Sequence, residues 1–354
     1  MRKAGSPARF SSVFGGKDSK MAIEGKCGLS ALRVTLLLFL LLAHTSYGSH
    51  ASFQIGSVAL SPDGKLVAFD AKEGSTSFIY KVAADSGIAT RLTNATTGEE
   101  TSPAFSPDGK RIAFVYWPGK GARSRIVMVD GDGSNPREWS PSGVTDFSPV
   151  YSPDNKTIVF ARAELYGSDS PIAQPHAHAW KFYAGDLDGG NIREITPENS
   201  YTVSPPSISP DGTSMVVVTE GLETNRQIAV YSLVDPGPPT QTLQPHVPNE
   251  ADHKNPILAY PNYLPDGSIL FMAATNGKHG YDYDIYRMVL RMGTLERLTN
   301  GNGYATGLRI SADGRTAAFL KWRKNWIGDL ISNQVYMLDV QSRETKPLNI
   351  SGLR

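Results

Sequence analysis

The pattern of polar and apolar positions repeats along most of the chain. A polar turn of four residues precedes a short run of aliphatic, β-branched and aromatic residues, and this unit occurs six times. In the first copy, Ser61-Pro62-Asp63-Gly64 precedes Lys65-Leu66-Val67-Ala68-Phe69. The turns occupy residues 61–64, 106–109, 152–155, 209–212, 264–267 and 311–314, so successive copies begin 45, 46, 57, 55 and 47 positions apart. Apolar runs of this kind, bounded by turn residues, predict β-strands.

The turn residues explain why each unit begins with a hairpin. Proline sets φ to about −65° at the first turn position, and aspartate bonds back to nearby backbone amides. Glycine takes the left-handed position without steric cost, and Asn155 takes that position in the third copy.

Each unit then continues in the same order. A further strand follows, such as 125–130, then a glycine turn at 131–135 and a short strand that often ends in Leu-Thr. Four strands in a repeat of about 45 residues are typical of a propeller blade. The sequence therefore predicts an all-β fold: a six-bladed β-propeller, with four antiparallel strands per blade, over residues 53–354.

The repeated Ser-Pro-Asp-Gly units resemble the PD40 repeats of the TolB-like, WD40-like β-propeller family. The resemblance covers nearly all of the chain after residue 52 and is specific because the motif recurs six times in phase. It implies a propeller and a protein partner in the cell envelope. The chain leaves no room for the α/β domain that precedes the propeller in TolB, so the role of that domain is not carried over.

Residues 1–52 have the composition of a targeting segment. A polar leader is followed by Lys26 and Arg33, the apolar run 34–43 and the small residues Ser46, Gly48, Ser49 and Ala51. The order basic, apolar, small is that of a signal peptide, and an uncleaved N-terminal anchor is the alternative. Both interpretations predict an exported protein, periplasmic or secreted, that is not integral to the membrane unless this segment is retained.

Composition narrows the classes of partner. The formal net charge is +1, which gives no basic field for nucleic acid. The single cysteine, Cys27, precedes the repeats, so the propeller is expected to have no disulfide and no cysteine-based zinc site.

The phase of the repeat assigns residues to the two faces of the ring. Loops between the second and third strands of a unit, and between units, emerge opposite the Ser-Pro-Asp-Gly turns. The histidines of the repeats all fall in such loops: His176, His178, His246, His253 and His279. Loops held by a rigid scaffold often carry function.

Four of these histidines form a candidate metal site. His176 and His178 are two apart in an extended segment and would point the same way, and His246 and His253 lie in the next loop between units. A mixed histidine and carboxylate site could hold a divalent metal. There is a distant similarity to oligogalacturonate lyases, propellers whose histidines hold a divalent metal, without an in-phase match. The alternative is that these are solvated polar residues that bind no cofactor.

Aromatic and basic residues in the equivalent loops form a candidate ligand-binding surface. Trp322, Arg323 and Trp326 lie in the sixth unit, Trp117 in the second, and His279 in the fifth. Exposed tryptophan and arginine anchor protein interfaces and can stack on sugar or peptide. The alternative is that each tryptophan folds back over a blade edge.

No catalytic residue is predicted, because the chain has no Gly-x-Ser-x-Gly elbow. The favoured function is a non-catalytic binding or scaffold propeller for a protein or peptide, with carbohydrate as a further ligand class. The alternative function is a metal-dependent polysaccharide lyase or hydrolase that uses the loop histidines.

Overall fold

The structure is a computed structural model that describes residues 54–119, 122–167, 176–200, 204–220, 226–247, 256–277, 280–301, 303–324 and 330–353. The chain divides into two units, Met1–Ala51 and Ser52–Arg354, and every described residue belongs to the second. These residues form strands and turns and no α-helix. Consequently, no helix in the described ranges is long and apolar enough to cross a membrane.

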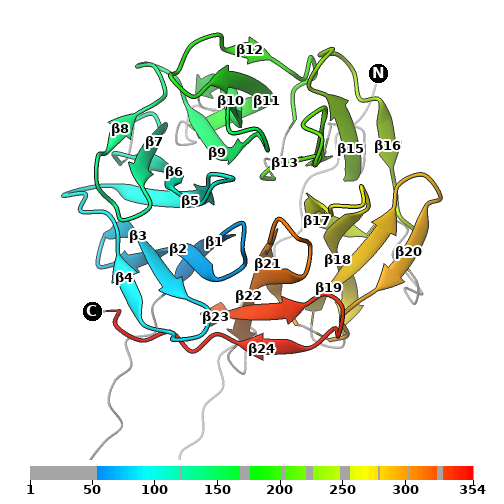
Figure 1. Cartoon of the computed structure of the whole chain (residues 1–354). Coiled ribbons are helices and arrows are strands. Elements are labelled where there is room, and N and C mark those ends of the chain that lie inside the picture. The colour runs from blue at the N-terminus through cyan, green and yellow to red at the C-terminus, as the bar shows by residue number, and fades with distance from the viewer. Residues whose placement is uncertain are drawn as a thin grey trace, which may run out of the picture. The chain divides into compact units, whose positions relative to one another are not determined.

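The described residues form 24 strands (Figure 1). The first eight are β1 (Ile55–Leu60), β2 (Leu66–Glu73), β3 (Thr76–Ala83), β4 (Ala89–Arg91), β5 (Glu99–Phe105), β6 (Arg111–Trp117), β7 (Arg125–Asp130) and β8 (Arg137–Glu138). The next eight are β9 (Asp146–Tyr151), β10 (Thr157–Gly167), β11 (His176–Asp186), β12 (Arg193–Glu194), β13 (Ser207–Ile208), β14 (Ser214–Thr219), β15 (Gln227–Ser232) and β16 (Gln241–Leu243). The last eight are β17 (Ile257–Tyr263), β18 (Ile269–Gly277), β19 (Gly280–Val289), β20 (Thr294–Arg297), β21 (Ala305–Ile310), β22 (Thr316–Lys324), β23 (Leu330–Asp339) and β24 (Thr345–Pro347).

The strands form one eight-stranded sheet and four four-stranded sheets. The large sheet consists of two antiparallel halves, β1–β4 and β5–β8, joined by a single parallel pair between Ser77 and Glu99. Figure 1 shows the sheets around a common centre, with β1, β5, β9, β13, β17 and β21 nearest to it. This is the arrangement of a β-propeller, and the all-β propeller expected from the sequence is confirmed.

The turns are stabilised by the same serine–aspartate contact in five of the six copies. In the fifth copy, which begins with Leu264, Ser268 Oγ donates to Asp266 Oδ1 instead. In the first, Ser61 Oγ donates to Asp63 Oδ1 at 2.6 Å and accepts a hydrogen bond from the Leu66 amide at 2.8 Å. The Gly64 amide donates to the Ser61 carbonyl at 2.9 Å, and Gly64 has a φ of 71°. The turn thus satisfies its own polar groups and starts the next strand in a fixed register.

The apolar core lies between neighbouring sheets. Each of six buried clusters combines residues from two successive four-stranded units, and the cluster around Phe69 combines the first unit with the last through Leu320 and Val335. Because every unit buries both of its faces, the strands next to the innermost ones are almost continuously apolar, as in β2 and β6.

Contacts between the first and last units close the ring. β1 pairs only with β2, so the last sheet does not borrow a strand from the start of the repeats. Instead, the Ala89 amide donates to the Ser351 carbonyl, and the Ser351 amide donates to the Gly87 carbonyl, both at 2.8 Å. The Asn333 side chain accepts from the Ile55 amide at 3.0 Å and donates to the Ile55 carbonyl. Side-by-side packing plus this short latch therefore joins the ends.

Candidate functional site

A cavity of about 480 Å³ lies on the axis of the ring, at the ends of the innermost strands that lead into the Ser-Pro-Asp-Gly turns. All six innermost strands contribute to it, and five turn prolines and Ala312 complete its wall. Its lining includes Pro62, Pro107, Pro153, Pro210 and Pro265. We call this cavity the channel mouth. A rigid concave site of this volume is large enough for a small ligand or a few side chains of a peptide.

One equivalent position on each innermost strand, two residues before the turn, lines the channel mouth. The six residues are Ala59, Ala104, Val150, Ser207, Asn262 and Arg309. On the first three strands this position is small and apolar, and on the last three it is polar. The wall of the channel mouth is therefore divided into an apolar half and a polar half that carries one positive charge.

Arg309 is the one charged residue at these six positions, and few polar groups of the described residues contact its guanidinium. Its Nη1 donates to the carbonyl of Leu308 at 3.1 Å, and the described residues place no carboxylate within ion-pair distance of it. Burial lowers the pKa of Arg309 to about 10, so the guanidinium remains protonated at neutral pH. Burial also raises the pKa of the neighbouring Tyr260, which stays a neutral phenol.

The other polar residues on this half have defined hydrogen bonds. Asn262 is buried, and its Nδ2 donates to the carbonyls of Tyr260 at 2.8 Å and Leu308 at 3.1 Å. Ser207 Oγ accepts a hydrogen bond from the Tyr263 amide at 2.9 Å, which leaves its hydroxyl hydrogen available as a donor. This half can therefore donate hydrogen bonds from Arg309 and Ser207.

Aspartates of the turns surround the channel mouth. Hydrogen bonds from the turn serine and the turn backbone lower the pKa of these carboxyls, as in Asp63 and Asp313, so they are ionised at neutral pH. In four copies the residue two positions after the turn aspartate is basic: Lys65, Lys110, Lys156 and Arg315. The rim is thus densely charged with both signs, whereas the interior carries only Arg309.

A second cavity, of about 630 Å³, lies between β4 and the β7–β8 hairpin. Of its charged groups, Arg125 pairs with Glu138 at 2.8 Å, Arg137 donates to the Leu187 carbonyl, and the buried Glu100 accepts a hydrogen bond from Thr93. Burial raises the pKa of Glu100 to about 6. Arg125 Nε has no hydrogen-bond partner among the described residues, but each charged group of this groove makes at least one polar contact, so the groove is a weaker ligand-site candidate than the channel mouth.

The tryptophans predicted to bind a ligand use their indole N–H groups inside the chain. Trp117 Nε1, at the end of β6, donates to the Ala122 carbonyl at 2.9 Å. Trp322 Nε1, in β22, donates to Thr306 Oγ1 at 3.1 Å. Both side chains are partly buried, and Arg323 beside Trp322 is exposed. This geometry agrees with the folded-back alternative, and ligand binding by these residues stays a prediction.

The structure changes the local setting of two predicted metal ligands. His176 and His178 lie in β11, paired with Gly167 and Leu165 of β10, and not in a loop. The inserted residues of the third unit lengthen the β10–β11 hairpin and so place the two histidines in its strands. His246 is exposed and follows β16. His253, His279 and Trp326 lie outside the described residues.

Within the described ranges, no three histidine, cysteine, aspartate or glutamate side chains are grouped as a metal site would require. The side chains of His176 and His178 are not among those described, so the four-histidine metal site stays a prediction.

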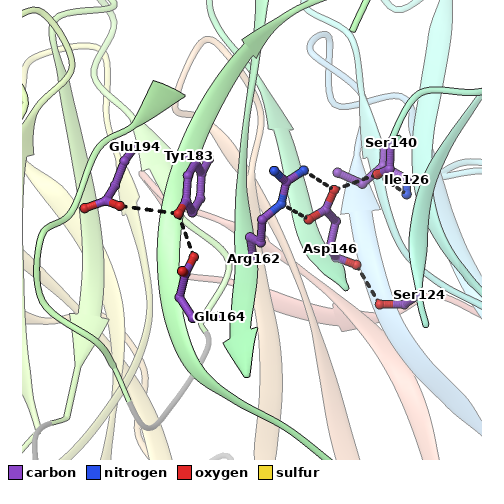
Figure 2. A network of polar contacts seen from close by, with 8 residues as sticks. All are labelled: Ser124, Ile126, Ser140, Asp146, Arg162, Glu164, Tyr183 and Glu194. Atoms are coloured by element: carbon purple, nitrogen blue, oxygen red, sulfur yellow. Dashed lines mark hydrogen bonds and ion pairs between the residues drawn. The ribbon is translucent and has the colours of Figure 1, made fainter. Parts of the chain in front are cut away.

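A buried ion pair within the third unit is linked to the second unit by two serine hydrogen bonds (Figure 2). Asp146 is fully buried, and its carboxylate accepts hydrogen bonds from Arg162 Nε at 2.7 Å, Arg162 Nη2 at 2.9 Å and Ser140 Oγ at 2.8 Å. Ser140 Oγ in turn accepts from the Ile126 amide at 2.8 Å, and Ser124 Oγ donates to the Asp146 carbonyl at 2.9 Å. Burial raises the pKa of Asp146, and Arg162 offsets part of that rise. The network is internally satisfied, which indicates a structural role.

Fold and repeat define the class as an all-β propeller with an open axial cavity. Residues 42–174 match the family model described as PD40, the TolB beta propeller domain, so this part of the chain carries PD40 propeller sequence. The resemblance drawn from the repeated turns is thereby confirmed.

Two curated relatives match parts of the chain. An uncharacterised protein of Agrobacterium fabrum is 31% identical over 160 residues, which cover 45% of this chain and 52% of that protein. Dipeptidyl-peptidase 5 of Arthroderma otae is 28% identical over 209 residues, covering 53% of this chain and 27% of that protein. The chain thus spans about half or less of the length of these relatives.

Two solved structures share the fold. TolB from Acinetobacter baumannii superposes with a TM-score of 0.54 at 16% identity, covering 88% of this chain and 67% of that one. Oligogalacturonate lyase from Vibrio parahaemolyticus superposes with a TM-score of 0.52 at 14% identity, covering 83% and 78%. At such identities the similarity establishes the propeller fold alone.

Sequence reasoning missed the channel mouth because it looked for function in the loops on the face opposite the turns. The signal was present in the repeat itself: the residue two positions before each turn is alanine, alanine, valine, serine, asparagine and then arginine. An arginine at a position that is elsewhere small or neutral indicates a site that only one unit provides.

Proposed function

We propose that this protein is an exported, non-catalytic propeller that binds a protein or peptide segment at the channel mouth. The observation that carries the proposal is the divided wall of that cavity, with an apolar half beside a polar half that contains Arg309, which has no carboxylate partner in the described part of the chain. Ligand pockets typically combine apolar walls with a few polar groups that set orientation. The described residues offer no acid, base and nucleophile grouped at this cavity.

We propose further that the ring has six blades. Each half of the eight-stranded sheet has four strands, as does each of the other sheets, and each contains one Ser-Pro-Asp-Gly-type turn between its first two strands. Counting each half as one blade supports this number, with the propeller spanning residues 53–354 and a targeting segment or anchor at 1–52.

Export and a cell-envelope partner belong to the same proposal. The basic, apolar and small residues before Ser52 support export to the periplasm or the outside. A relative named as the Tol-Pal system protein TolB of Francisella tularensis, 24% identical over 224 residues, supports a protein partner of the envelope.

Site-specific photo-crosslinking tests the proposed binding. A photoreactive phenylalanine replaces Ala104, which is partly buried in the apolar half of the channel mouth. The matched control places the same residue at Lys346, which is exposed on the outer strand β24. Irradiation of the source cells should yield a discrete protein adduct from position 104 and none from position 346.

The absence of an adduct at position 104, together with turnover of a defined substrate by the purified protein, would contradict the proposal. The histidine hypothesis is decided separately by elemental analysis. A stoichiometric divalent metal in the purified protein would favour the alternative metal-dependent lyase or hydrolase.

A further inference from the structure

We infer that the channel mouth recognises a peptide carboxylate, with Arg309 as the residue that pairs with it. This inference rests on the proposed function and specifies its ligand. Arg309 is the charged member of a ring of six equivalent positions, and it lies on the wall of an open cavity. The cavity therefore has one fixed point at which an anionic group gains a partner.

Other arginines in this fold show how the chain treats a partly buried guanidinium. Arg162 pairs with the buried Asp146, and Arg297 pairs with the buried Asp284. Arg309 has no such carboxylate among the described residues and donates only to a neighbouring carbonyl. A charge that is removed from water without a partner is costly, so a ligand carboxylate would supply what the fold supplies to the other two arginines.

The chemistry of the cavity favours a single carboxylate over a phosphate or a polyanion. A guanidinium binds a carboxylate through two parallel N–H···O bonds, and Ser207 adds a hydroxyl donor on the same half. Arg309 is the one charged residue that lines the cavity, so a group with several negative charges would leave most of them without a partner there.

The apolar half defines the rest of the ligand. Ala104 and Val150 line the cavity without a polar side-chain atom, so they favour an aliphatic or aromatic group next to the carboxylate. The expected ligand is therefore a peptide segment in which a carboxylate adjoins an apolar residue. The carboxylate can be that of a C-terminus or of an aspartate or glutamate side chain.

Three pools of hexapeptides distinguish these sources. The first ends in a free carboxylate and has no acidic side chain, the second is amidated and contains one aspartate or glutamate, and the third is amidated and contains asparagine or glutamine instead. Each pool is passed over the immobilised full chain, and retained peptides are quantified by mass spectrometry. The wild type should retain at least one acidic pool about tenfold more strongly than the neutral pool.

The Arg309→Gln variant should lose about 10- to 100-fold of that affinity, the range expected for one hydrogen-bonded charge pair. Arg309→Lys should keep part of it, and Ser207→Ala should lose less than Arg309→Gln. Arg315→Gln is the matched control, because Arg315 is an exposed arginine on the same face, outside the lining of the cavity. The control should bind as the wild type does.

The thermal unfolding midpoint of each variant separates loss of binding from loss of folding. Should Arg309→Gln fail to fold, Arg309→Lys and Ser207→Ala carry the test. Equal retention of all three pools by the wild type, or undiminished retention by Arg309→Gln, overturns the carboxylate inference and leaves peptide binding intact. Retention of no pool by the wild type counts against both the inference and the proposed function.

Discussion

Removing the carboxylate of Asp146 should destabilise the junction between the second and third units more than any comparable surface change. Asp146 is fully buried and accepts three hydrogen bonds of 2.7–2.9 Å, two of them from Arg162 (Figure 2). The Arg162 side chain is only 16% exposed, so Asp146→Ala leaves a nearly buried guanidinium without its partner. Breaking a buried pair in this way costs about 3–5 kcal/mol in the free energy of unfolding.

Smaller changes to the same hydrogen-bond network should lower the free energy of unfolding by less. Ser140→Ala leaves Asp146 with both bonds from Arg162 but deprives the Ile126 amide of its acceptor, so it should cost about 1–3 kcal/mol. Asp188→Ala is the control, because Asp188 is exposed in a turn and accepts one amide hydrogen bond. The control should lie within about 1 kcal/mol of the wild type.

Urea unfolding followed by the fluorescence of the five tryptophans measures these differences, and Trp139 is the one that lies at the junction with Phe160. Trp139 is 5% exposed and packs edge-on against Phe160, with 5.1 Å between the ring centroids. In the double variant Asp146→Ala/Arg162→Met no charge remains unpaired, so its cost should fall below the sum of the single costs by about 2 kcal/mol. Additive costs, or an Asp146→Ala variant within about 1 kcal/mol of the wild type, would refute the reasoning.

Three further predictions concern the pH dependence of stability, the effect of a glycine substitution and the effect of metal removal. Burial raises the pKa values of Asp70 and Glu100 to about 6, so the folded state binds their protons more tightly than the unfolded state does. Stability should therefore rise by about 1 kcal/mol per group from pH 7 to 5, and Asp70→Asn should remove its share in denaturation curves at both pH values. Gly87→Ala should lower the melting temperature by several degrees, because a Cβ at this position would lie 2.0 Å from the Asn349 carbonyl oxygen and because Gly87 has a φ of 70°. Gly237→Ala is the control and should leave the melting temperature unchanged, because no atom lies within 4 Å of a Cβ there. If no metal binds, EDTA should leave the melting temperature unchanged, and a fall would favour the histidine site.

The fold was largely predictable because its turns are specified by side chains that bond to their own neighbours in the sequence. Ser61 and Asp63 satisfy each other and the following amides, so the start of each second strand follows from four residues. The Leu-Thr ending had no stated role in the sequence. In the structure, Thr93 Oγ1 accepts a hydrogen bond from the Ile79 amide and donates one to the carboxylate of Glu100 in the next unit. This residue therefore links two neighbouring units.

The candidate site was not predictable in the same way, because it depends on which equivalent positions meet across the ring. Arg309 is about 250 residues from Ala59 in the chain, yet both line the same cavity once the ring closes. Strand lengths also escaped prediction. Strands β10 and β11 have eleven residues each, and their pairing carries His176 and His178 into a strand, since an insertion can extend a hairpin as readily as a loop.

The junction between the first and last units, which we call the seam, is held by hydrogen bonds and side-by-side packing alone. Ile55 and Asn333, which hold each other across it, are 278 positions apart, and no strand crosses from one side to the other. During synthesis, the apolar side of the first sheet around Phe69 therefore has no partner until the last sheet has been made. A force applied to the two ends of the repeats would open this seam before any other junction, because it depends on packing and a few hydrogen bonds rather than on a covalent connection. Within the propeller, the junction between the first and last units is therefore the expected weak point of the ring.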